Sequence, residues 1–181
     1  DTRYSSFILV RKDRGITSVK QLEGKRIAFV NRTSASGFLY PMATLIRAGL
    51  DPTRILEDAV FLDAHPKVIE AVAAGEVDAG ATFFGAVAAA RDQQVDTGVL
   101  RVLALAGRIP FDAIVAHPDV DPALAQRVRD AFLALNSTTD RGRAALGHRI
   151  EINGWVLPSE EVYETVRETL ALVREATEGG L

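Results

Sequence analysis

Strand-like and helix-like segments alternate along the first 105 residues, and this alternation restricts the possible folds more than any other feature of the sequence. Short, mostly apolar runs indicate strands at residues 4–12, 27–30, 59–62, 77–82 and 100–105. Apolar residues recur at helical spacing in residues 18–22, 36–48, 68–74 and 84–91. Because short joints connect these segments, the pattern predicts an α/β fold with a doubly wound, mostly parallel sheet.

The chain beyond residue 105 departs from this alternation. Pro110 interrupts the pattern and predicts a crossing point before a strand at residues 113–116. Residues 123–135 are predicted to form an amphipathic helix, and residues 136–147 are polar and helical only in part. An extended segment at 152–157 and a long helix at 160–177, rich in Glu and Arg, are expected to complete the chain.

Composition excludes several classes of function. The chain has 181 residues and a net charge of −3, which argues against nucleic acid as a main partner. It contains no cysteine, so disulfides and thiolate chemistry are excluded, and its three histidines are too scattered to predict a metal site. No apolar run is long enough to span a bilayer. Since the sequence starts at Asp1 without a signal peptide, we expect a processed or truncated product.

The turn at residues 31–37 carries the clearest functional signal. Thr33, Ser34 and Ser36 lie between a predicted strand and a predicted helix, where the first backbone N–H groups have no partner. Hydroxyls, free N–H groups and the positive end of the helix dipole together suit a tetrahedral oxyanion. Gly37, which has no Cβ, allows close approach. The alternative is that Ser34 or Ser36 only caps the helix.

Ligands of doubly wound sheets bind at the carboxyl ends of the strands. Four stretches meet that description here: residues 31–37, 63–66, 82–85 and the turn after Leu105. A nucleophilic site is not indicated, because Ser36 lies outside a Gly-x-Ser-x-Gly motif and no His/Asp pair has a recognisable spacing. We therefore expect no catalytic residues, no metal and no cofactor.

Tyr4, the turn Thr33–Phe38, His65, the run Val77–Gly80 and the pair Ile109–Pro110 together resemble one family. The chain is similar to the phosphate-, phosphite- and phosphonate-binding subunits of ABC importers, which are type II periplasmic binding proteins. The resemblance covers residues 4–163, and the order and spacing of the motifs are more specific than any single motif. It implies two α/β lobes that close over a ligand by a hinge.

The resemblance also implies a set of ligand-binding residues. Ser34 and Ser36 match the outer serines of a Ser-Thr-Ser triplet that holds the phosphonate oxygens, and Thr33 precedes them. Ala35 replaces the middle threonine, so one hydroxyl is missing, although the Ala35 N–H can still donate. His65 matches a histidine that also reaches the oxygens, with a surface turn residue as the alternative.

Two further matches concern the rest of the ligand. Tyr4 matches a ligand-contacting tyrosine near the lobe crossing, with an edge-strand aromatic residue as the alternative. Asp112 matches an aspartate that contacts the amine of aminoalkylphosphonates, whereas Gly85 stands where those proteins carry a second carboxylate. This departure weakens the case for an amine-bearing ligand.

The resemblance divides the chain at about residue 108. Residues 4–108 are expected to form one complete ligand-binding lobe, and residues 109–181 the hinge crossing and a return segment into a first lobe that lacks its leading part. Without that leading part, we expect apolar side chains of the return segment to be exposed to solvent. We therefore expect residues 113–181 to self-associate. The side chains concerned are Val128, Phe132, Leu135, Trp155, Val156 and Val166.

These observations predict a solute-binding protein that captures phosphite, a phosphonate or phosphate for an ABC importer. The resemblance implies an ABC permease as partner and a periplasmic or extracellular, lipid-anchored location. Two alternatives remain open at this stage. One is a sensory input domain of the same fold, and the other is a cofactor-biosynthesis enzyme of related fold in which Asp78 or Asp112 acts as a base.

Overall fold

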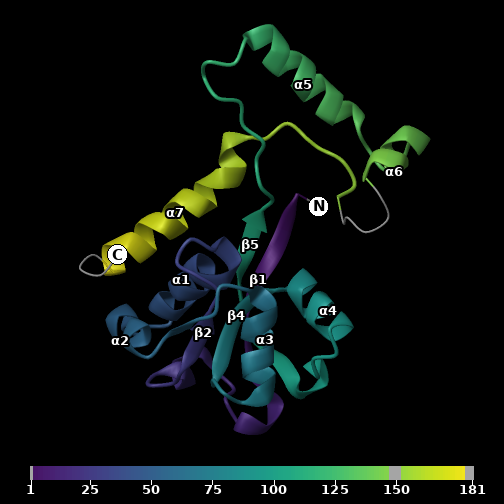
Figure 1. The fold of residues 1–181 in the computed structure, drawn as a ribbon. Helices are drawn as coiled ribbons and strands as arrows, with labels where there is room; N and C mark the ends of the chain where they lie inside the picture. Colours follow the sequence, from purple (N-terminus) through teal and green to yellow (C-terminus); the bar gives the residue numbers. More distant parts are fainter. Residues whose placement is uncertain (1, 147–151, 178–181) are drawn as a thin grey trace. The chain divides into compact units, whose positions relative to one another are not determined.

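The computed structural model describes residues 2–146 and 152–177. Its contacts divide the chain into two units, the first made of residues 1–111 and 163–181 and the second of residues 112–162. The first unit contains a five-stranded sheet in the order β3-β2-β4-β1-β5 (Figure 1). The strands are β1 (Arg3–Arg11), β2 (Ile27–Phe29), β3 (Val60–Phe61), β4 (Ala79–Phe83) and β5 (Leu100–Pro110).

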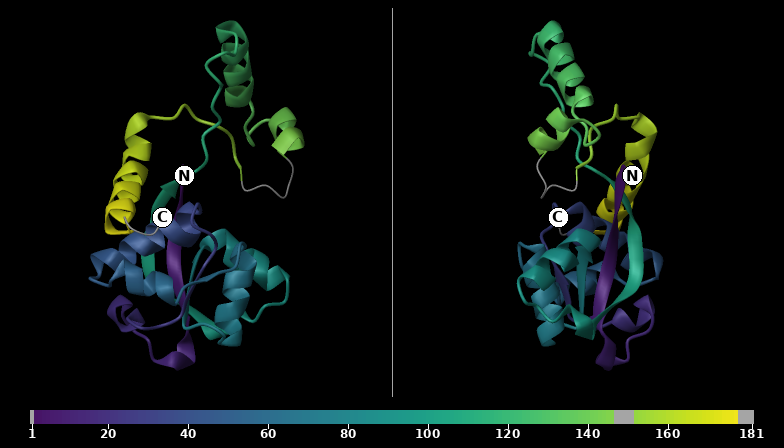
Figure 2. Two further views of the ribbon diagram at one scale, coloured as in Figure 1. Left: turned by 60° about the vertical axis from the view of Figure 1, so that its left-hand side comes forward. Right: turned by 90° about the vertical axis from the view of Figure 1, so that its right-hand side faces the viewer.

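Helices cover both faces of this sheet, as the views in Figure 1 and Figure 2 agree. Helices α3 (His65–Ala74) and α4 (Phe84–Asp92) cover one face. The other face packs against α1 (Tyr40–Arg47), α2 (Pro52–Glu57) and α7 (Glu160–Thr177), which buries Val173. Short 3₁₀ turns lie at Lys12–Arg14, Val19–Leu22 and Thr97–Val99.

The sequence of β1 shows why the sheet is covered on both sides. Phe7 and Leu9 belong to the apolar cluster under α3 and α4, whereas Ile8 and Val10 belong to the cluster under α1 and α2. All four are buried, because successive side chains of a strand point to opposite faces. An unbroken apolar run is therefore typical of a strand buried on both faces.

Strand direction confirms the predicted α/β class and adds one feature. Strands β3 and β4 pair with β2 in parallel, whereas β1 pairs antiparallel with both β4 and β5. Four strands thus point the same way, and β1 is inserted among them in the opposite direction. The amino-terminal half of β1 consequently lies at the same end of the sheet as the carboxyl ends of β2 and β4.

Several predicted boundaries were wrong. Strand β5 continues to Pro110, because an edge strand tolerates a proline at its end, and residues 112–117 form no strand. The predicted helix at 36–48 consists of a π-helix, η3 (Ala35–Leu39), that runs directly into α1. Residues 152–157 contribute only an isolated bridge from Gly154 to Asn136.

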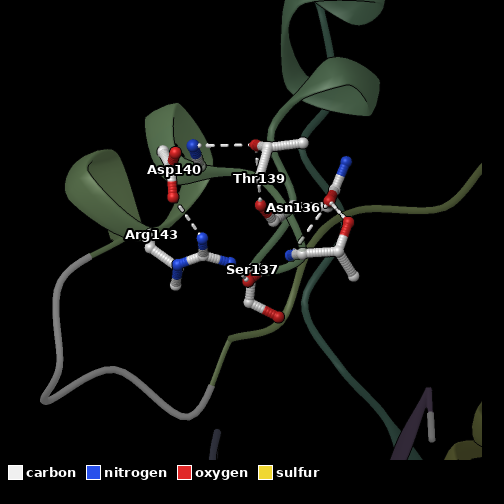
Figure 3. A network of polar contacts seen from close by, with 7 residues as sticks. Asn136, Ser137, Thr139, Asp140 and Arg143 are labelled. Atoms are coloured by element: carbon white, nitrogen blue, oxygen red, sulfur yellow. Dashed lines mark hydrogen bonds and ion pairs between the residues drawn. The ribbon is translucent and has the colours of Figure 1, made fainter.

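The second unit contains α5 (Pro122–Ala134) and α6 (Asp140–Leu146), with the rings of Phe132 and Trp155 5.1 Å apart. A polar network shapes the turn between the helices (Figure 3). The Gly142 N–H donates to Thr139 Oγ1 at 3.0 Å, and Arg143 donates to the Ser137 carbonyl at 3.0 Å and pairs with Asp140. The carbonyl oxygen of Asn136 lies where a Cβ on Gly142 would stand, so this turn requires glycine.

Candidate functional site

The serine turn, residues 31–37, is closed by hydrogen bonds of its own. Asn31 Oδ1 accepts the Thr33 N–H at 3.1 Å and the Thr33 hydroxyl at 2.8 Å. The Val30 N–H donates to the Gly37 carbonyl at 3.1 Å, which ties the turn to the end of β2. Gly37 is required there, since a Cβ would lie 2.4 Å from Val30 Cγ2.

Ser34 is the N-cap of η3. Its Oγ accepts the Gly37 N–H at 3.0 Å, and its carbonyl accepts the Leu39 N–H at 3.0 Å, an i to i+5 bond of a π-helix. Ser34 therefore caps the helix, as one of the two interpretations of the turn predicted. Capping uses the oxygen of the hydroxyl as an acceptor and leaves its proton available to a second partner.

Ser36 is buried and anchored to the neighbouring strand. Its carbonyl accepts a hydrogen bond of 2.8 Å from the hydroxyl of Ser6, which is fully buried on β1. The hydroxyl of Ser36 belongs to the same first turn of the helix as the Ser34 cap. The Ala35 and Ser36 N–H groups, which open the helix, lack intrahelical acceptors.

His65 begins α3, so its side chain stands at a helix N-terminus and not in a preceding loop. Its Nδ1 lies 3.0 Å from the hydroxyl of Thr82, and its ring stands edge-on to Phe83 with centroids 4.8 Å apart. Burial lowers the pKa of His65 below its ordinary value, so the imidazole is neutral at neutral pH. The surface-turn alternative does not describe this half-buried, hydrogen-bonded ring.

Tyr4 lies on β1 opposite Ile109 of β5. Its ring packs against two others, Phe83 at 5.6 Å and Phe111 at 5.4 Å between centroids. Since β1 is flanked by β4 and β5, the edge-strand alternative for Tyr4 was wrong.

The structure brings most of the predicted ligand-binding residues to one end of the sheet. Ser6 joins the strand of Tyr4 to the serine turn, and Phe83 touches the rings of both Tyr4 and His65. Asp112 is the first residue of the second unit, is exposed, and stays a prediction. Sequence reasoning missed Ser6, Thr82 and Phe83, although residues 82–85 were expected to face a ligand.

Asp78 does not face this end of the sheet. Its carboxylate accepts the Arg26 N–H at 3.0 Å, beside the amino ends of β2 and β4. A surface depression at that opposite end is lined by Gly24, Arg26, Glu57, Asp58, Ala59, Val60 and Asp78. The interpretation of Asp78 as a base in the cleft was therefore wrong, and the carboxylate has a structural role.

Comparison with known proteins identifies the family. A family model described as the periplasmic substrate-binding protein of phosphonate ABC transporters matches residues 1–163. The chain belongs to this family. Its members are transporter substrate-binding proteins and not enzymes. No helix in the described part of the chain is long and apolar enough to cross a membrane.

One curated relative and two solved structures give the comparison its detail. The phosphate-import protein PhnD of Mycolicibacterium smegmatis is 37% identical over 87 residues, which are 44% of this chain and only 27% of that protein. XAC2383 from Xanthomonas citri, solved bound to ATP, has a TM-score of 0.79 at 22% identity, covering 99% of this chain and 69% of the other. PhnD1 from Prochlorococcus marinus, solved in complex with methylphosphonate, has a TM-score of 0.76 at 19% identity. The match covers 96% of this chain and 68% of PhnD1. These structures support the predicted type II fold.

Proposed function

We propose that this protein captures a small phosphorus oxyanion, namely phosphite, a phosphonate or phosphate, for an ABC importer. Ser34, the Ala35 N–H, Ser36 and His65 hold the oxygens, with Thr33 at the rim of the turn. Tyr4 and Asp112 complete the ligand contacts. The location is periplasmic or, with a lipid anchor, extracellular, and the partner is an ABC permease.

One observation carries the proposal: donors from the serine turn lie at the same end of the sheet as His65. The turn offers the Ser34 and Ser36 hydroxyls and the first N–H groups of the helical run from η3 into α1. A phosphorus oxyanion bears several strong acceptors, and hydrogen bonds to a charged oxygen are stronger than neutral ones. The helix dipole adds to this attraction.

His65 suits the same role through its tautomer. When the Thr82 hydroxyl donates to Nδ1, the neutral ring carries its proton on Nε2, and Nε2 becomes a donor. Burial disfavours the charged imidazolium, which keeps this neutral form in the absence of ligand. Thr82 therefore sets the direction in which His65 donates.

The second carboxylate of aminoalkylphosphonate binders is missing at Gly85. A cationic tail would lose one of its partners, so we propose a compact ligand with an uncharged tail. Two of the relatives fit that size class, since one is named for phosphate import and another was solved with methylphosphonate, whereas XAC2383 was solved bound to ATP. Residues 4–108 form the complete lobe in this proposal, and residues 109–181 the hinge crossing and return segment.

Isothermal titration calorimetry of the purified protein tests the function. Phosphite, methylphosphonate, phosphate and 2-aminoethylphosphonate are titrated in turn, with sulfate as an oxyanion control. We expect saturable binding of at least one of the first three ligands and weaker binding of 2-aminoethylphosphonate. Absence of binding for every phosphorus oxyanion would refute the proposal, and selective, tight binding of the amine would refute the ligand class.

A further inference from the structure

Phe83 holds a central position among the rings at the candidate site. It is the last residue of β4, and its side chain is half-buried. Its ring contacts His65 on α3 and Tyr4 on β1, with centroid distances of 4.8 Å and 5.6 Å. The next residue, Phe84, is 75% exposed, so the two neighbouring phenylalanines have different surroundings.

The place of the Phe83 ring depends on Gly85. A Cβ on Gly85 would lie 2.8 Å from Phe83 Cε2 and 3.5 Å from Cδ2, which is too close for the ring to stay where it is. Any side chain at residue 85 would therefore displace Phe83. The Phe83 ring thus occupies the space that a side chain on residue 85 would need.

We infer that Phe83 limits the size of the substituent that a bound ligand carries on phosphorus. The inference rests on the proposed function. Because the Phe83 ring contacts both His65 and Tyr4, we expect a ligand that touches these two residues to lie against it. With its oxygens held by the serine turn and His65, the ligand has its remaining substituent confined by an aromatic wall. A hydrogen or methyl group fits such a site, whereas a longer chain requires the ring to move.

A homologous series of ligands tests the size limit without changing charge. Methyl-, ethyl- and propylphosphonate are titrated calorimetrically into the wild-type protein and into Phe83→Ala and Phe84→Ala. In the wild type and in Phe84→Ala we expect affinity to fall by roughly tenfold or more for each added methylene. Phe83→Ala is expected to bind propylphosphonate at least as tightly as methylphosphonate.

Two further variants keep the test decisive. Phe83→Leu retains an apolar side chain and should admit ethylphosphonate, which covers the case in which Phe83→Ala does not fold. Gly85→Ala displaces the ring, and should make the fall in affinity along the series smaller than in the wild type.

The outcomes separate this inference from the function on which it rests. If the wild type binds methylphosphonate and the folded Phe83→Ala or Phe83→Leu protein keeps the same fall in affinity along the series, Phe83 is not the size limit. A wild type that binds all three phosphonates equally also overturns the inference. A wild type that binds no phosphorus oxyanion overturns the proposed function instead, and the inference with it.

Discussion

The hydroxyl of Ser34 accepts a hydrogen bond from the Gly37 N–H and keeps its own proton for another acceptor. At the scale of single residues, capping and ligand binding are thus compatible roles, although the sequence presents them as alternatives. Ser36 differs, because it is buried and its carbonyl is held by the Ser6 hydroxyl. The two serines are expected to contribute donors of similar strength.

Replacing both serines should therefore abolish most of the oxyanion affinity. Each hydrogen bond to a charged oxygen contributes about 1.5–3 kcal/mol, so Ser34→Ala with Ser36→Ala should weaken binding roughly a hundredfold or more. Calorimetric titration with the preferred ligand of the wild type measures the effect. Ser159→Ala, which changes an exposed serine just before α7, serves as control. Unchanged affinity in the double variant would show that the turn is only a helix cap.

His65 predicts a dependence of stability on pH in the ligand-free protein. Burial lowers its pKa in the folded state, whereas the unfolded chain has the ordinary value of about 6.5. Below that value the unfolded state binds more protons than the folded state, so this group makes the free energy of unfolding fall as the pH falls. Well above that value the ring is neutral in both states, so the stability is fully present and no longer changes with pH through this group.

Urea unfolding between about pH 7.5 and pH 5 checks this expectation. His65→Gln removes the titrating group, and all other ionisable residues are shared by the two proteins. The wild type should lose stability relative to His65→Gln as the pH decreases. Parallel pH profiles would mean that the His65 ring is not held neutral by its surroundings.

At the scale of elements, one side chain connects the central strand to the serine turn. The buried Ser6 hydroxyl on β1 donates to the Ser36 carbonyl at the start of η3, and these residues lie 30 positions apart in sequence. Removal of the hydroxyl leaves the carbonyl without its partner, which costs about 1–3 kcal/mol. Ser6→Ala should therefore lower the free energy of unfolding by that amount and also weaken oxyanion binding.

Chemical denaturation measures the first effect and calorimetry the second. Ser5→Ala is the matched control, because Ser5 is the preceding residue of the same strand and is only half-buried. We expect that variant to keep nearly the wild-type stability and affinity. Equal effects of the two substitutions would contradict a special role for Ser6.

Local patterns predicted the elements that local interactions determine. The helices at α4, α5 and α7 and the serine turn between β2 and η3 followed from spacing and capping residues in the sequence. The antiparallel insertion of β1 did not, because strand partners are chosen by contacts between residues far apart. The hydrogen bonds of Ser6 and Thr82 were missed for the same reason, since their partners, Ser36 and His65, lie far away in sequence.

At the scale of the whole molecule, the second unit exposes many apolar side chains. Val115 is 82% exposed and Val156 is 65% exposed, and α5 buries none of its residues. Three other side chains of the second unit are partly buried, namely Phe132, Leu135 and Trp155. Val166 instead packs beside Tyr40 in the first unit, which the sequence did not predict. Contiguous exposed apolar surface is typical of interaction sites.

Because Tyr163–Leu181 belongs to the first unit, we narrow the expected self-association of the 181-residue chain from residues 113–181 to residues 113–162. Light scattering coupled to size-exclusion chromatography should give a mass that rises with protein concentration. Val128→Glu with Val156→Glu should restore the monomer, since a buried unpaired charge opposes association. Val102→Glu, which adds the same charge on the exposed side of β5, should leave the association intact. A wild-type monomer at all concentrations would contradict this expectation.

The position of β1 also has a consequence for the order of folding. Arg3 pairs with Pro110 and Arg11 with Leu100, so the strand that leads the sequence closes loops of roughly a hundred residues. Until β4 and β5 have left the ribosome, β1 has neither of its neighbours. Pairings of such long range form slowly. The sheet should thus close late in folding, after the local helices and the turn between β2 and η3 have formed.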